Sequence, residues 1–272
     1  MGRKFSVVTT FNATGYKKYG KRMIQTFLQN WPAEVTLIVY AEDCEVAEAA
    51  SNLTVLDLHQ DSPALVAFKE KWRGVPKANG DVSDDPMRSR RKDAGKGFKW
   101  HAVRFAHKVY AIFAATNSTT DWLIWMDADT VCHSPITMSQ ISDLCPRTAD
   151  LCFLGRKGKY TECGLYAMNL RSNNTLTFLK EFRRVYDDAE NGIFTLEEWH
   201  DSFVFDIVRK SMTLAEHDWS SHLIRGEGHP LINSKWGAYL DHLKGDRKDQ
   251  GRSKNKDLLV HRTEEYWTKK II

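Results

Sequence analysis

The sequence has no uninterrupted apolar run as long as the roughly 20 residues that cross a bilayer. Its opening residues, MGRKFSVVTTFN, also lack the long apolar region that precedes the cleavage site of a signal peptide. We therefore expect neither a membrane span nor export. Gly2 and Ser6 fit the loose pattern for N-myristoylation, but the apolar residues from Phe5 onward predict that a core strand begins there.

Cysteine pairs at regular spacing are also missing. The five cysteines are an odd number and include no Cys-x-x-Cys pair. A disulfide framework or a structural zinc site would need such pairs. Reduced thiols in a cytoplasmic protein are therefore the better interpretation.

Positive charge is only slightly in excess, with a formal net charge of +4 from 39 lysines and arginines and 35 aspartates and glutamates. A chain of 272 residues with 42% hydrophobic residues suits one large globular domain. The basic residues gather in two segments, residues 69–99 and 244–256. Such segments are either solvated loops or surfaces for an anion, such as a phosphodiester backbone or a nucleotide phosphate.

Strands and helices are predicted to alternate along most of the chain. Short apolar runs predict strands over residues 4–11, 34–41, 53–58, 122–126, 150–155 and 163–170. Helical spacing predicts helices over residues 16–30, 42–50, 98–115, 173–187, 195–211 and 233–243. This alternation is typical of an α/β fold with a mixed, mostly parallel sheet and helices on both faces.

Residues 71–97 stand apart from this alternation. They are polar, charged and rich in glycine and proline, which indicates a mobile basic insertion rather than a linker between domains. We therefore treat residues 1–248 as one domain and residues 249–272 as a basic tail that packs on or beside it.

The run TTDWLIWMDADTVCHSPIT, residues 119–137, contains a strand that we expect to be buried on both faces and that ends on two aspartates. Side chains alternate along a strand, so Asp127 and Asp129 point the same way and repel each other unless a cation or donors lie between them. Ligands of open α/β sheets bind at the carboxyl ends of strands, and carboxylates there suit Mg²⁺ or Mn²⁺ with substrate phosphates. A strand end with two hydrated aspartates is the alternative.

The same motif invites a second interpretation. Asp-x-Asp-x-(Thr/Val) after an apolar strand resembles the motif of haloacid-dehalogenase-type phosphatases, whose first aspartate is the nucleophile. Here the threonine, Thr130, comes one place early, and 126 residues precede the motif, which usually lies near the start of such domains. This interpretation therefore ranks below metal binding.

A second motif, DHLKGDRK, follows more than a hundred residues later and contains His242, Gly245 and Lys248 in the pattern H-x-x-G-x-x-K. A neutral imidazole is a good third metal ligand. A glycine lets the backbone approach a diphosphate, and a lysine offers a compact positive charge to its oxygens. A basic surface loop would explain either half alone, but both halves together with the aspartates predict a site for a metal and a diphosphate.

In this order the two motifs resemble those of the retaining GT-A glycosyltransferases of the glycogenin and bacterial lipopolysaccharide galactosyltransferase type. The resemblance covers most of residues 5–248 at the level of pattern. It implies the GT-A fold, a Rossmann-like domain that binds a nucleotide sugar, with Mn²⁺ or Mg²⁺ held by Asp127, Asp129 and His242. Lys248 would add positive charge where the leaving diphosphate becomes more negative.

The resemblance also implies which residues bind the nucleotide. Thr9, Thr10 and Phe11 end a strand that is similar to the one that holds the base in this family, and Arg104 is similar in position to a nucleotide-binding arginine. The remaining contacts with the nucleotide would come from the two motifs themselves, including Ala128 and Gly245.

Two further acids are candidates for the sugar site. In ECGLYAMNL, Gly164 matches a strand of the family's sugar pocket, with Glu162 in place of an asparagine. In EEWHDSFVF, Asp201 matches one acid of a helix start near the reacting centre. Glu162 and Asp201 would contact the sugar hydroxyls or face the anomeric carbon; an exposed acid and a helix N-cap are the structural alternatives.

The resemblance implies transfer of a hexose, with glucose favoured, from a UDP-sugar to a hydroxyl acceptor. In its small size, its lack of a membrane signal and its clustered basic charge, the chain also resembles bacteriophage enzymes that glycosylate 5-hydroxymethylpyrimidines in DNA. Such an enzyme would act in the host cytoplasm. Such an enzyme must extrude its target base from a duplex. Trp72, Trp100 and Trp236 could stack on a base, although core packing is the commoner role for a tryptophan.

Other functions stay open at this point. The acceptor could be a glycan, a lipooligosaccharide or a protein, although the sequence has no sustained apolar helical stripe for a lipid and no marked tyrosine for self-glucosylation. A different class is a non-catalytic nucleic-acid-binding protein that keeps the aspartates for structural reasons.

Overall fold

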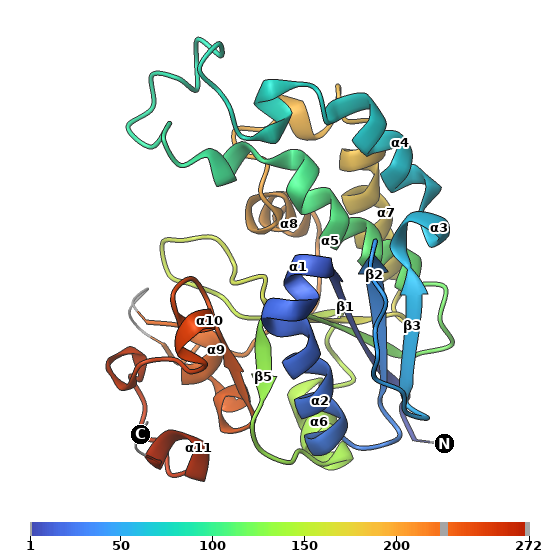
Figure 1. The fold of residues 1–272 in the computed structure, drawn as a ribbon, viewed down its shortest axis with the longest axis vertical. Helices are drawn as coiled ribbons and strands as arrows, with labels where there is room; N and C mark the ends of the chain where they lie inside the picture. Colours follow the sequence, from blue (N-terminus) through green and yellow to red (C-terminus); the bar gives the residue numbers. More distant parts are fainter. Residues whose placement is uncertain (1, 224–227, 270–272) are drawn as a thin grey trace.

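The computed structural model describes residues 2–223 and 228–269 (Figure 1). Its centre is a seven-stranded sheet with the order β3-β2-β1-β4-β7-β6-β8. The strands are β1 (Phe5–Asn12), β2 (Thr36–Glu42), β3 (Leu53–Asp57), β4 (Trp122–Met126), β6 (Leu151–Phe153), β7 (Leu165–Asn169) and β8 (Glu216–Asp218). A second, two-stranded sheet pairs β5 (Thr130–Cys132) with β9 (Leu240–His242).

The main sheet is mixed and mostly parallel. Strands β3, β2, β1 and β4 run parallel to one another, β7 is antiparallel to β4 and β6, and β8 is parallel to β6. All five residues of β4 are buried, as its unbroken apolar run predicts. The predicted α/β class and sheet type are therefore confirmed.

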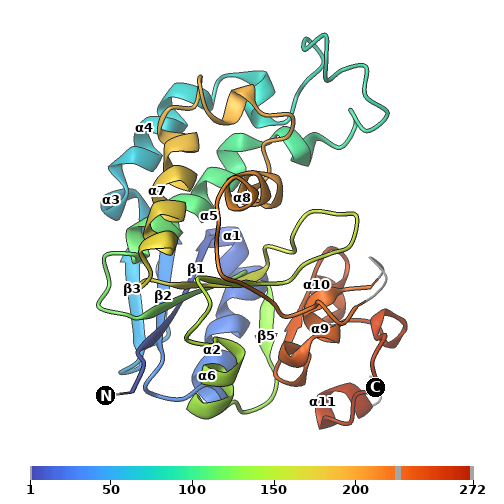
Figure 2. The ribbon, with the colours of Figure 1, turned by 180° about the vertical axis from the view of Figure 1, so that it is seen from behind.

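Helices cover both faces of the sheet (Figures 1 and 2). One face carries α3 (Leu58–Asp61), α4 (Pro63–Trp72), α5 (Ala102–Ala115), α7 (Asn173–Asp187) and α8 (Asp201–Lys210). The other face carries α2 (Lys21–Asn30), α6 (Met138–Leu144) and α9 (Pro230–Asn233). The remaining helical elements are α1 (Ala13–Gly15), α10 (Arg247–Gln250), α11 (Glu265–Thr268), a π-helical turn (Tyr16–Gly20) and 3₁₀ turns at Pro76–Asn79, Gly97–Trp100, Ile193–Thr195, Lys235–Ala238 and Asn255–Asp257.

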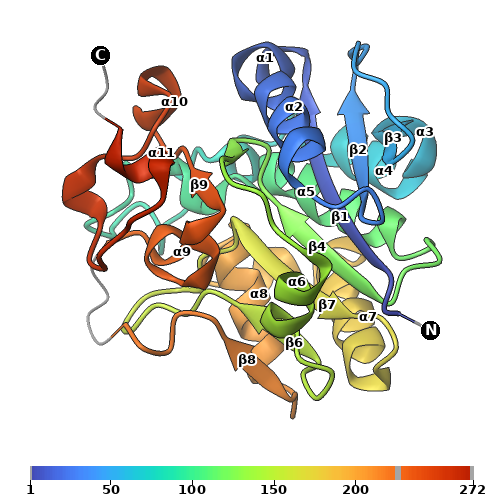
Figure 3. The same ribbon diagram turned by 90° about the horizontal axis from the view of Figure 1, so that it is seen from below.

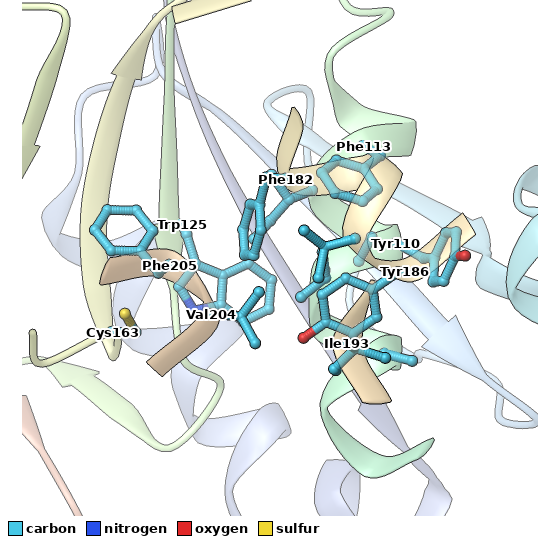
Figure 4. Packing of buried hydrophobic residues seen from close by; sticks show 14 of the residues in the cluster. Tyr110, Phe113, Trp125, Cys163, Phe182, Tyr186, Ile193, Val204 and Phe205 are labelled. Atoms are coloured by element: carbon cyan, nitrogen blue, oxygen red, sulfur yellow. The ribbon is translucent and has the colours of Figure 1, made fainter. Parts of the chain in front are cut away.

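Two hydrophobic cores result, one on each face of the sheet, because neighbouring strand residues point to opposite sides. The core under α5, α7 and α8 is rich in aromatic rings, among them Trp125, Phe182 and Tyr186 (Figure 4). Trp72, Trp100 and Trp236 are also buried in the cores, so none of them can stack on a ligand base.

Several predicted elements agree with the structure and others do not. Helix α7 has the predicted bounds, and the Ser172 side chain caps it by accepting a hydrogen bond from the Asn174 amide. The predicted helix over residues 42–50 is wrong: Glu42 ends β2, and Asp43 turns the chain with φ of 54°, outside the helical region. Helices α3 and α4 are additional elements that the sequence analysis did not assign.

The predicted helix over residues 233–243 is wrong in a way that matters for the site. Only the 3₁₀ turn Lys235–Ala238 is helical, and the chain then forms strand β9. The antiparallel partner of β9 is β5, with Thr130 opposite His242 and Cys132 opposite Leu240. A tertiary pairing thus overrides local helical spacing.

The insertion that projects at one end of the molecule is fastened to the domain at its base (Figure 1). Arg91 forms ion pairs with Glu197 and with Glu198, the latter at 2.9 Å. Arg88 lies over the ring of Trp199, with its guanidinium carbon 4.7 Å from the ring centroid.

None of the helices in the described part of the chain is long and apolar enough to cross a membrane.

The C-terminal segment lies beside β9 and α9 at the edge of the domain (Figure 3). The Trp267 indole is buried and donates a hydrogen bond of 2.7 Å to the carbonyl of Gly237. The Tyr266 hydroxyl donates a hydrogen bond of 2.8 Å to Asp241, which precedes His242 on β9. The segment therefore supports the strand that carries the predicted metal ligand.

We expect Asp150→Asn to lower the free energy of unfolding by about 1.5–3 kcal/mol, the range for hydrogen bonds to a charged group. The buried Asp150 carboxylate accepts hydrogen bonds from Ser172, from Asn174 and from the Ala215 amide, and so ties β6 to β8 and α7. Burial raises the pKa of Asp150, but these donors outweigh burial and hold the pKa below its ordinary value.

Because the native pKa of Asp150 lies below the unfolded value of about 3.9, its stabilisation is complete above that pH and is lost as pH falls through the native pKa. Urea unfolding at pH 7 and about pH 3 should therefore show a smaller difference between wild type and Asp150→Asn at the lower pH. Asp143→Asn, at an exposed position, is the control. An equal loss at both pH values would contradict this account.

Candidate active site

The first aspartate of the motif is held by the end of strand β4. The Asp127 amide donates a hydrogen bond of 2.8 Å to the carbonyl of Gly164 on the neighbouring chain segment. Its side-chain Oδ1 accepts hydrogen bonds from the Trp125 indole at 2.7 Å and from the Lys108 ammonium at 3.0 Å. One carboxylate oxygen is therefore committed, while Oδ2 lies 3.4 Å from Nε2 of His242.

The pairing of β5 with β9 brings His242 to the aspartates. His242 is 1% exposed, and its Nε2 lies 3.0 Å from Oδ1 of Asp129. Gly164 leaves room for the ring, since a Cβ atom at this position would lie 2.3 Å from Cε1 of His242. A larger residue at position 164 would push the imidazole away from both carboxylates.

Positive charges keep the Asp129 carboxylate ionised. Burial raises the pKa of Asp129, but His242 and Lys248 outweigh it and hold the pKa well below its ordinary value. The Lys248 ammonium lies 2.8 Å from Oδ2 of Asp129. Burial lowers the pKa of His242, yet Asp129 outweighs burial and raises it. The ion pairs with Lys248 and His242 therefore offset the cost of burying the Asp129 carboxylate.

The three side chains fit a hard divalent cation. Ligand atoms of Asp127, Asp129 and His242 all lie within 4.8 Å of one another. Two carboxylates and one imidazole are a donor set that Mn²⁺ and Mg²⁺ accept, with phosphate oxygens completing the shell. His242 Nε2 faces both carboxylates, and its Nδ1 has no hydrogen-bond partner among the residues that the structure describes.

A second group with similar spacing consists of Glu42, His59 and His107. The Lys69 ammonium lies 2.9 Å from Nε2 of His59, and Asp43 lies 3.3 Å from its Nδ1. Both ring nitrogens of His59 are therefore engaged, and a lysine already supplies the positive charge. This group is a weaker metal site than the first.

Two cavities meet at the predicted metal ligands. The smaller one, of about 310 Å³, extends from Asp129 to Glu42 and Thr10. The larger one, of about 980 Å³, extends from Asp129 toward the insertion. The residues that line both are Phe105, Asp127, Asp129, Asp201 and Lys248. A ligand that occupies both cavities would pass directly over the metal ligands.

The structure brings nearly all predicted site residues to these cavities. The smaller cavity is lined by Thr10, Phe11, Arg104 and Ala128, together with the shared residues. The larger cavity is lined by Glu162, Gly164, His242 and Gly245. Thr9 is the exception: it is 0% exposed, and it lines neither cavity. Gly245 has φ of 60°, a left-handed conformation that favours glycine at the turn between His242 and Lys248.

Lys108 is a central residue that the sequence analysis missed. It is 8% exposed, and its ammonium lies 3.0 Å from Asp127 and 2.7 Å from Asp201. It also donates a hydrogen bond to the carbonyl of Cys163. Burial lowers the pKa of Lys108, but the two aspartates outweigh burial and raise it well above its ordinary value. Lys108 directly precedes the apolar run VYAIFAA of the same helix, and that position was the available signal.

No protein-family model matches the sequence, and no curated protein matches it. Solved structures similar to this chain include the glycosyltransferase GlyE of Streptococcus pneumoniae TIGR4 (TM-score 0.44, 9% identity, covering 80% of this chain and 45% of that one). Another is mouse xyloside xylosyltransferase 1 (TM-score 0.45, 12% identity, 79% of this chain and 84% of that one). A third is the bifunctional glycosyltransferase WbbM (TM-score 0.47, 9% identity, 90% of this chain and 46% of that one). The chain thus spans less than half the length of GlyE and WbbM.

Loss of a residue that only hydrogen-bonds to a metal ligand typically weakens metal binding by about 10- to 100-fold. We expect His242→Ala and Asp129→Ala, which each remove a ligand itself, to weaken Mn²⁺ binding by more than that. Each change removes one of three donors that converge on one point. Electron paramagnetic resonance of free Mn²⁺ during titration would measure this loss of affinity. Asp246→Asn, an exposed acid in the same turn, is the control and should bind as wild type. Unchanged Mn²⁺ affinity in both ligand variants would place the metal elsewhere.

We expect Lys108→Met to lower the free energy of unfolding by about 3–5 kcal/mol, because it leaves the buried Asp201 carboxylate and the half-buried Asp127 carboxylate without their shared cation. Urea unfolding at neutral pH would measure the loss. Lys17→Met, at an exposed position, should cost far less. A loss below about 1 kcal/mol for Lys108→Met, the range of surface ion pairs, would refute the importance of this interaction.

Proposed function

We propose that this chain is a metal-dependent, retaining glycosyltransferase of the GT-A type that moves a hexose from a UDP-sugar to a hydroxyl acceptor. The observation that carries the proposal is the convergence of Asp127, Asp129 and His242 on one point at the carboxyl end of a central strand. Lys248 lies beside them, as a diphosphate site requires. The two motifs thus meet in space in the way that their resemblance to this family implies.

The smaller cavity suits the nucleotide. Arg104 lines it and makes no ion pair with any residue in the ranges 2–223 and 228–269, so its charge is available for a phosphate. Thr10 and Phe11 lie at the far end, where the base would bind. The diphosphate would then lie between Arg104 and Lys248, next to the metal ligands.

A divalent ion held by Asp127, Asp129 and His242 would supply Lewis-acid neutralisation of the diphosphate oxygens. Lys248 contributes a fixed positive charge at the same place. A poor leaving group becomes a better one when this charge is arranged before the reaction begins.

Asp201 is the better placed of the two candidate sugar-site acids. It lines both cavities, and Lys108 holds it in place at 2.7 Å. Burial raises the pKa of Asp201, but Lys108 outweighs it and keeps the carboxylate ionised. An ionised carboxylate here would hold a sugar hydroxyl or stabilise positive charge at the anomeric carbon. Glu162 also lines the larger cavity, but Lys244 and Arg156 engage it from two sides.

For the acceptor we propose a 5-hydroxymethylpyrimidine in DNA, as in bacteriophage genomes. The larger cavity is lined by several basic side chains from different parts of the chain: Lys96, Lys99, Arg156, Lys159, Lys210, Lys244 and Lys248. Clustered positive charge of this kind attracts a phosphodiester backbone. All five cysteines are free, which suits the reducing cytoplasm where such DNA would be modified.

The test is a transfer assay with labelled UDP-glucose and Mn²⁺ on hydroxymethylcytosine DNA, hydroxymethyluracil DNA and plain DNA, beside a lipooligosaccharide acceptor. We expect label only in hydroxymethylated DNA, loss of transfer with chelator, and at least about a 100-fold loss in Asp129→Ala. Asp246→Asn should transfer as wild type does.

Two other results would each change a different part of the proposal. Label in lipooligosaccharide alone would overturn the DNA acceptor and leave glycosyl transfer standing. DNA binding that Asp129→Ala does not alter, with no turnover of any UDP-sugar, would instead identify a non-catalytic nucleic-acid-binding protein.

A further inference from the structure

The larger cavity has an aromatic wall that a sugar nucleotide in the smaller cavity does not need. Phe98, Tyr160 and His200 all line it, and they come from three separate segments. The ring centroid of His200 lies 5.9 Å from that of Phe98 and 5.3 Å from that of Tyr160. His200 is buried, so it supports the other two rings from behind, and Phe98 and Tyr160 present the accessible aromatic surface.

Phe98 is unusual among the apolar side chains of this protein. It is 49% exposed, and among the large exposed apolar residues of the described chain it alone lines either cavity. Exposing a phenylalanine ring to water is unfavourable, so its position in a cavity wall indicates a ligand that covers it.

The exposure does not come from a loose backbone. Trp100, two residues later in the same 3₁₀ turn, is fully buried, and its indole donates a hydrogen bond of 3.0 Å to the carbonyl of Glu197. Lys99 forms ion pairs of 2.7 Å with both Asp93 and Glu198. These contacts, made by the two residues that follow Phe98, fix the turn that presents Phe98 to the cavity.

The rest of the lining favours a flat ring on a polyanion over a glycan. Sugar hydroxyls are usually bound by amides and free carboxylates, but the lining contains no asparagine or glutamine. Of its acids, Glu162 is already ion-paired with Lys244 and Arg156, and Asp127, Asp129 and Asp201 lie at the junction with the smaller cavity, where the donor is proposed to bind. Lys96, at the rim next to Phe98, makes no ion pair with any described residue and so can meet a phosphate.

We propose that Phe98 and Tyr160, backed by the buried ring of His200, form a subsite that stacks a pyrimidine base taken out of a DNA acceptor, with Lys96 on the neighbouring backbone. This inference rests on the proposed function and names the contact that selects its acceptor. Bases stack on aromatic side chains irrespective of sequence, so this wall recognises a displaced base as such. The subsite holds the base beside Asp201, where both cavities meet.

Transfer at this subsite forms one bond at the anomeric carbon and breaks another. The hydroxymethyl oxygen of the stacked base forms a bond to the anomeric carbon of the donor sugar. The bond from that carbon to the diphosphate oxygen breaks, and its electron pair leaves with UDP. The hydroxyl proton passes to the departing diphosphate, so the products are the glycosylated base and UDP.

The experiment compares Phe98→Ala with Met87→Ala, an exposed apolar residue (72%) of the same insertion that lines neither cavity. Transfer to hydroxymethylated DNA and acceptor-free hydrolysis of UDP-glucose are measured in parallel. We expect Phe98→Ala to lower the ratio of transfer to hydrolysis by about 5- to 150-fold, the loss of one base–aromatic stack, mainly through a higher KM for DNA. Phe98→Tyr should restore most of it, and Met87→Ala should match wild type.

A ratio unchanged in Phe98→Ala, with wild-type transfer to DNA intact, would overturn the stacking subsite and leave the proposed function standing. The same loss in Phe98→Tyr as in Phe98→Ala would also overturn it, because that variant keeps the ring. If the wild-type protein transfers no sugar to DNA, the proposed acceptor and the subsite fail together.

Discussion

The antiparallel pairing of β5 with β9 is the constraint on which the site depends. It joins the strand that follows Asp129 to a strand more than a hundred residues later and sets Thr130 opposite His242. This register fixes the imidazole against both carboxylates, at 3.0 and 3.4 Å. Without it, the two motifs would be a strand end and a basic loop. Gly164 completes the arrangement, because a side chain there would occupy the space of the imidazole.

Ion pairing is the second requirement, since a carboxylate buried without a partner is strongly destabilising. Each acid at the junction of the cavities has a basic partner: Asp127 and Asp201 with Lys108, and Asp129 with His242 and Lys248. Glu162 in the larger cavity is paired with Lys244. The partners come from separate elements, so the charges hold the surrounding segments together. Stability and the proposed chemistry therefore use the same contacts.

Local sequence patterns predicted the structure where a segment decides its own conformation. The run WLIWM is apolar on both faces and forms a buried central strand, and Ser172 caps a helix whose bounds its spacing predicts. Patterns failed where a distant segment decides the conformation. The end of residues 233–243, for example, forms strand β9 because it pairs with β5. Lys108 belongs to no motif, because its two aspartates meet only in the folded chain. Exposure of Phe98 beside buried Trp100 is likewise a property of packing, not of composition.

The same charge balance explains why a metal and a nucleotide should bind as a unit. Asp127, Asp129 and Asp201 already have basic partners, so the charges of Lys108 and Lys248 are largely balanced at the metal ligands. A diphosphate brings additional negative charge, and Arg104, which lines the smaller cavity, can receive it. A divalent ion bound alone would instead compete with Lys248 for Asp129 and add positive charge beside it. Each ligand thus supplies the charge that the other lacks, and we expect each to bind weakly by itself.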